Sequence, residues 1–197
     1  MFIKLLKKAP IVLFTLNFIA CSVFTPASAS TPTAADIEKE EQAVYAFFVS
    51  GNTGTAIILQ DTSTNISSDD PQESIDYIKS GLQSISNETI NNYLERNAQP
   101  GQLSPDMDLG VDYVLLSTDE LSAIMGQADG WAVLNEKYPN SNGYTVFSRV
   151  GFNNSLDQAV IYVGNMAGPL MGSGFYYLME KKNGEWVIKE QVMVWIS

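Results

Sequence analysis

The ionisable side chains of the sequence limit the chemistry that the protein can perform. Its 197 residues include 22 aspartates and glutamates, one cysteine and no histidine. A Ser-His-Asp relay is therefore excluded, and so is a zinc site built from cysteine and histidine. The one cysteine, Cys21, lies in a leader described below, so the processed chain also lacks a disulfide and a thiolate nucleophile.

Paired carboxylates are the remaining acid–base chemistry. Glycosidases place two of them about 5 to 9.5 Å apart across a cleft. The acids available here lie on the last predicted hairpin and on two helical segments before it: Glu180, Glu185, Glu190, Asp119, Glu120, Asp129 and Glu136. Charged side chains on the strands of a hairpin usually lie on a face of the sheet that is exposed to solvent, so we assign no catalytic residue. A hydrolase or isomerase that uses carboxylates or tyrosines in a sheet-lined pocket is the alternative function.

Two segments are similar to ligand-binding loops but lack residues that such loops need. Segment 61–70, "DTSTNISSDD", alternates oxygen side chains like a calcium loop, but Ile66 replaces the glycine and Gln72 the glutamate. Segment 164–174, "GNMAGPLMGSG", leads from strand to strand and contains no lysine or arginine, unlike a phosphate cradle. We therefore expect no metal and no cofactor. We expect 164–174 to be a glycine-bent connection with its methionine and leucine side chains against the sheet; a ligand-facing rim is the alternative.

Three residues are candidates for ligand binding. Arg149 is the only basic residue in "TVFSRVGF", and if it points inward it needs a partner carboxylate or an anionic ligand. An outward ion pair is the default expectation. Tyr162 and Tyr176 lie on neighbouring predicted strands and could line a small-molecule pocket, although cross-strand packing explains them equally well.

The first 29 residues have the order of a secretory signal peptide. Lysine-rich "MFIKLLKK" precedes apolar "APIVLFTLNFIACSVF" and small, polar "TPASAS". Ala27 and Ala29 form an A-x-A site, which predicts cleavage after Ala29 and a periplasmic or secreted protein. "FIAC" resembles a bacterial lipobox, so the alternative is a membrane-tethered lipoprotein, lipidated at Cys21. No later stretch reaches the roughly 20 apolar residues of a transmembrane helix.

The net charge excludes one class of partner. It is −11 for the whole sequence, and loss of the three leader lysines makes it about −14. Nucleic-acid binding needs clustered lysines and arginines, which are absent here. The expected partner is therefore a small molecule or a protein.

The pattern of elements predicts one α+β domain over residues 36–197, after a short tether at 30–35. A helix is expected at 36–51, a buried strand at 55–63 and mainly helical structure from about 72 to 140. Asn183-Gly184 predicts a type I′ hairpin. The C-terminal third predicts a four-stranded antiparallel meander with helices packed on one face, its strands being 143–152, 158–164, 174–182 and 185–197.

The last 60 or so residues resemble an uncharacterised family of exported bacterial proteins. Its members carry SRVGFN, YVGN, a glycine loop, GYY and EKKNGEW in this order, and this chain has "SRVGFN", "YVGN", "GFYY" and "EKKNGEW". The resemblance implies export but transfers no catalytic residue. More loosely, a helix followed by strands that end in "GEWVI" is similar to the NTF2-like and cystatin-like curved-sheet folds. We therefore predict a non-catalytic binding or envelope-associated module.

Overall fold

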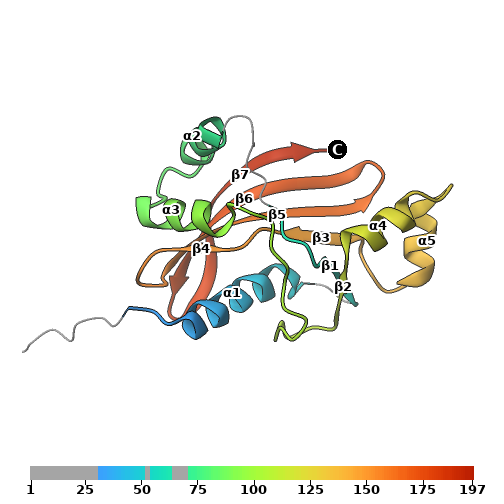
Figure 1. The fold of residues 1–197 in the computed structure, drawn as a ribbon, viewed down its shortest axis with the longest axis horizontal. Helices are drawn as coiled ribbons and strands as arrows, with labels where there is room; N and C mark the ends of the chain where they lie inside the picture. Colours follow the sequence, from blue (N-terminus) through green and yellow to red (C-terminus); the bar gives the residue numbers. More distant parts are fainter. Residues whose placement is uncertain (1–30, 52–53, 64–70) are drawn as a thin grey trace, which may run out of the picture.

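A mixed β-sheet with helices on both of its faces forms the fold (Figure 1). The computed structural model describes residues 31–51, 54–63 and 71–197. The predicted leader, with Cys21 and the A-x-A site, lies outside these residues, as does most of segment 61–70. Within the described ranges, no helix is both long enough and apolar enough to cross a membrane.

Seven strands form one sheet among the described residues. They are β1 (Ala56–Leu59), β2 (Tyr113–Leu116), β3 (Tyr144–Phe147), β4 (Gly151–Phe152), β5 (Gln158–Gly168), β6 (Met171–Lys182) and β7 (Glu185–Ile196). Their order is β2-β1-β3-β5-β6-β7, with β4 paired to β5. Strand β1 is parallel to β2 and β3, and the other pairs are antiparallel.

The α+β class is confirmed, but the sheet is larger than the predicted four-stranded meander, and it is mixed. Two short parallel strands, β1 and β2, extend it beyond β3. The predicted first strand, 143–152, is divided into β3 and β4, because residues 148–150 leave the regular ladder.

The helices of the described part cover both faces of the sheet, so the prediction of helices on one face is wrong. They are α1 (Ala34–Val49), α2 (Pro71–Gly81), α3 (Asn87–Arg96), α4 (Thr118–Met125) and α5 (Gly130–Lys137). On β5, Ala159, Ile161 and Val163 pack in the cluster that contains α1 residues. The alternate residues Val160 and Tyr162 pack with α2 and α3, on the other side of the strands (Figure 1). The reason is the continuous apolar run of β5, which has no polar face to leave in water.

Helices α4 and α5 share the face of α2 and α3, at the end of the sheet formed by β1 and β2. Ile57 and Val146 pack in their cluster. Val146 pairs with Gly164, which is two residues from Tyr162 on β5. Because side chains alternate along a strand, Val146 and Tyr162 lie on the same face of the sheet. Segment 103–109 lies with α1 on the opposite face through its leucine and methionine side chains.

Side-chain caps fix where the helices begin. Thr33 and Asp36 form a capping box on α1, which therefore begins inside the segment predicted as a tether. Ser86 caps α3, Ser117 caps α4 and Asp129 caps α5.

The C-terminal part of the sheet contains two hairpins, β5–β6 and β6–β7, and the sequence predicted the turn of the second better than that of the first. Asn183 (φ 55°) and Gly184 (φ 90°) have the left-handed backbone of the predicted type I′ turn. The glycine-rich segment, in contrast, is almost entirely strand, since β5 and β6 pair as far as Gly168 and Met171. Leu170 and Met171 at the tip are 81% and 65% exposed, so the expectation that they pack against the sheet is wrong.

We predict that Gly151→Ala destabilises the protein, because α3 packs directly on the backbone of β4. A Cβ atom at Gly151 would lie 2.5 Å from the Cα atom of Tyr93. Helix α3 would have to move, and such overpacking typically lowers the free energy of unfolding by about 1–3 kcal/mol. Urea unfolding of the purified protein measures this loss. The control is Gly51→Ala, since a Cβ at Gly51 meets no atom within 4 Å. Equal unfolding free energies for the two variants would contradict this packing.

Candidate functional site

A buried glutamate, Glu41, is the centre of the candidate site. It lies on the face of α1 that packs against the sheet, and its side chain is only 7% exposed. Glu41 was not predicted as a site residue. A signal was present, because Glu41 falls between Ile37 and Val44 at the three- and four-residue spacing of one helical stripe.

Arg149 forms a two-pronged ion pair with Glu41. Its Nε donates to Oε1 of Glu41 over 2.8 Å, and its Nη2 donates to Oε2 over 2.7 Å. The default expectation of an outward ion pair is therefore wrong: Arg149 points inward, to a partner carboxylate on α1. The fork geometry is specific to arginine, because a lysine ammonium cannot match both carboxylate oxygens in this way.

A second arginine, Arg96, lies against the same carboxylate. Its Nη2 is 2.8 Å from Oε1 of Glu41, and its side chain is 19% exposed. The contact is an ion pair by distance but lacks hydrogen-bond geometry, and neither Nε nor Nη2 of Arg96 has a hydrogen-bond partner among the described residues. Two guanidinium groups therefore share one carboxylate.

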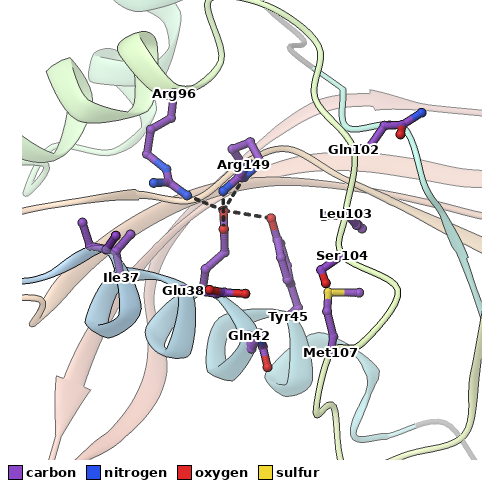
Figure 2. Close-up of a pocket in the computed structure, with 12 residues that line it drawn as sticks. Ile37, Glu38, Gln42, Tyr45, Arg96, Gln102, Leu103, Ser104, Met107 and Arg149 are labelled. Carbon is purple, nitrogen blue, oxygen red and sulfur yellow. Dashed lines mark hydrogen bonds and ion pairs between the residues drawn. The ribbon is translucent and has the colours of Figure 1, made fainter.

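Neutral donors complete the environment of Glu41. The Tyr45 hydroxyl donates to Oε1 over 3.0 Å and also lies 3.1 Å from the carbonyl oxygen of Ser148. The N–H of Val150 donates to Oε1 over 3.0 Å. Figure 2 shows Tyr45 and both arginines converging on this carboxylate.

Asn97 fixes the backbone of Arg149. Its Oδ1 accepts from the N–H of Arg149, and its Nδ2 donates to the carbonyl oxygens of Arg149 and Tyr93, each over 2.9 Å. Asn97 is 3% exposed and directly follows Arg96 at the end of α3. One buried amide thus holds the segments that carry both arginines in register.

The electrostatics keep Glu41 ionised. Burial by itself raises the pKa of its carboxyl, but the hydrogen bonds from Arg149 and the charges of Arg96 and Arg149 together lower the pKa further. The Val150 N–H acts in the same direction, so the pKa lies below its ordinary value of 4.5. Burial raises the pKa of Tyr45 well above 10.0, which keeps its hydroxyl a donor. A carboxylate held this way does not accept protons at neutral pH, so it is a poor general base.

A cavity of about 400 Å³ opens beside the cluster, between α1 and segment 102–107 (Figure 2). Glu41, Arg96 and Arg149 form its charged wall. Its other side chains are mixed: apolar Ile37, Leu103 and Met107, polar Gln42, Gln102 and Ser104, and the exposed Glu38.

Tyr162 and Tyr176, the other two candidate ligand residues, lie on the opposite face from α1. Both are core residues, 5% and 2% exposed, with ring centroids 5.6 Å apart. The Trp195 Nε1–H donates to the hydroxyl of Tyr162 over 2.8 Å. Tyr176 borders a second cavity of about 320 Å³ near Tyr77 and α2. The structure therefore does not bring the tyrosines together with Arg149.

Several of the acids considered for catalysis have structural partners instead. Glu180 forms an ion pair with Lys189, and Glu120 forms one with Lys137. Glu190 accepts the N–H of Ser84 over 3.1 Å. Within the described part of the chain, no group of three or more histidine, cysteine, aspartate or glutamate side chains is placed to hold a metal ion.

No protein-family model, curated protein or solved structure matches this chain. The resemblance to exported bacterial proteins and to curved-sheet folds therefore stays a prediction.

We predict that Glu41→Gln destabilises the protein strongly at pH 7. The amide keeps the shape of the side chain but leaves two arginine charges without their buried partner, which typically costs about 3–5 kcal/mol. The measurement is urea unfolding. The matched control, Glu120→Gln, breaks an exposed ion pair and should change the unfolding free energy by less than about 1 kcal/mol.

The stability difference between the wild type and Glu41→Gln should also depend on pH. Because the folded pKa of Glu41 lies below 4.5, its charge stabilises the fold fully above that pH, and this stabilisation is lost as the pH falls through the folded pKa. The difference in unfolding free energy between the wild type and Glu41→Gln should therefore shrink only below about pH 4.5. A difference that is already absent at pH 7 would contradict the role of the carboxylate.

Proposed function

We propose that the protein is an exported, non-catalytic binding module whose ligand site is the cavity between α1 and segment 102–107. The observation that carries this proposal is the state of Glu41. Its oxygens already accept hydrogen bonds from Arg149, Tyr45 and Val150. The cluster therefore holds side chains in place instead of moving protons.

The cavity has the properties of a small-molecule site. Its volume of about 400 Å³ falls within the roughly 300–1,000 Å³ that is usual for ligand pockets. Its lining combines apolar side chains with a few fixed polar groups, as such pockets do. Because Glu41 and Asn97 already orient Arg149, binding does not have to order that side chain.

Export is supported by the order of segments in the leader and by the A-x-A site at Ala27 and Ala29. The resemblance of the last 60 or so residues to exported bacterial proteins points the same way. Association with the envelope through a lipid on Cys21 is the alternative form of the same proposal.

A fragment screen tests the binding site. We expect fragments to shift the amide resonances of Gln102, Leu103 and Arg149 in ¹H–¹⁵N spectra of the purified protein. Ser104 is an exposed lining residue, and Ser104→Trp should block the cavity and abolish these shifts. The control is Ser122→Trp, which adds the same side chain at an exposed position of α4. Fragments that bind Ser104→Trp as well as the wild type would refute the site.

Intact mass of the protein exported by a bacterial host tests the localisation. We expect a chain that begins at Ser30 and carries no lipid. Ala29→Glu should block this processing, since the residue before the cleaved bond must be small, whereas Cys21→Ser should leave it unchanged. A lipid-modified chain that begins at Cys21 would show the tethered form instead.

A further inference from the structure

Arg149 has hydrogen-bond donors left over on the side away from Glu41. A guanidinium carries five N–H donors, and Glu41 takes one from Nε and one from Nη2. The Nη1 group takes no part in the pair with Glu41. The side chain of Arg149 is 33% exposed, against 7% for Glu41, and it lines the cavity. Its remaining donors can therefore meet a ligand.

The charges in the buried part of the wall do not balance. One carboxylate faces two guanidinium groups, which leaves one positive charge in a chain whose net charge is −11. The two-pronged pair with Arg149 already neutralises Glu41, so Arg96 adds a cation without adding an acceptor. Among the residues that the structure describes, Glu38 is the only other charged one that lines the cavity. It is exposed, so solvent and salt screen it more than the buried groups.

From these two observations we infer that the ligand is a small carboxylic acid with a short apolar body, and that its carboxylate binds the free edge of Arg149. This inference rests on the proposed binding function. A carboxylate matches the planar donor edge of a guanidinium, and it would give the cluster two anions for two cations. Ile37, Leu103 and Met107 supply an apolar surface in the same cavity for the rest of the molecule.

The exposed carboxylate of Glu38 gives the inference a sharp consequence. It opposes an incoming anion but does not belong to the buried cluster, and it forms no ion pair among the described residues. Its removal should therefore strengthen the binding of an acid and leave the binding of a neutral molecule of the same shape unchanged.

The experiment compares hexanoate with hexanamide, which differ in charge but hardly in shape. Each is titrated into the purified protein at low ionic strength and followed through the amide resonances of Gln102, Leu103 and Arg149. We expect hexanoate to bind at least about tenfold more tightly than hexanamide, and the difference to shrink in high salt.

Two variants locate the contact. Glu38→Gln should lower the dissociation constant of hexanoate several-fold and leave that of hexanamide unchanged, while Glu136→Gln, the same change at an exposed site of α5, should alter neither. Arg149→Lys keeps the charge but loses the fork and should weaken hexanoate binding about tenfold. If Arg149→Lys does not fold, Glu38→Gln still decides the question.

A dipeptide with a free or an amidated C-terminus, Ala-Leu or Ala-Leu amide, distinguishes a peptide carboxylate from a free acid. Preference for Ala-Leu over both hexanoate and the amide would assign the site to peptide C-termini and support recognition of a carboxylate. Equal dissociation constants for hexanoate and hexanamide at the cavity residues would overturn the inference and leave cavity binding intact. No shift of these residues with any probe or fragment would overturn both.

Discussion

A carboxylate buried between two arginines is the constraint on which the rest of this structure depends. An ion removed from water must be compensated by charges and hydrogen-bond donors close to it. For Glu41 these come from three separate parts of the chain: Arg96 at the end of α3, Arg149 and Val150 between β3 and β4, and Tyr45 one turn along α1. The requirement to compensate one ion thus joins α1, α3 and the sheet.

The same requirement explains why the predicted strand 143–152 is divided. Residues 148–150 leave the regular ladder, and several of their backbone groups bond to side chains instead. Val150 donates to Glu41, the backbone of Arg149 exchanges hydrogen bonds with Asn97, and the carbonyl oxygen of Ser148 accepts the hydroxyl of Tyr45. Because buried backbone groups need partners, a regular strand here would have left Glu41 without the donor that Val150 supplies.

The fixed charges are also the basis for the proposed binding function of the cavity. A carboxylate that acts as a general base needs a pKa near the working pH. Burial raises the pKa of Glu41, but its arginine partners lower it below the ordinary value. Recognition requires side chains that are already oriented and donors that are still free, and Arg149 offers both. A local excess of positive charge favours an anionic ligand at the cavity. The rest of the surface is strongly acidic and therefore has little affinity for such a ligand.

Local patterns determined much of the secondary structure. Ser86, Ser117 and Asp129, residues of the types that favour helix starts, cap α3, α4 and α5, and Asn183-Gly184 forms the predicted turn. A cap or a tight turn involves only residues close together in the chain. The absence of histidine likewise follows from the sequence alone and excludes whole classes of mechanism.

The tertiary structure decided the arrangement of layers and the site. Periodicity shows that β5 is apolar on both sides but not which helices cover each side, so the second helical layer was not predicted. The strand expected at 55–63 forms as β1, but its parallel pairing with β2 and β3 was not predicted either. Glu41 and Arg149 are 108 residues apart, and no local pattern pairs them. An ion pair over such a separation exists only after α1 has packed on the sheet, because only packing brings the two charges together and removes them from water.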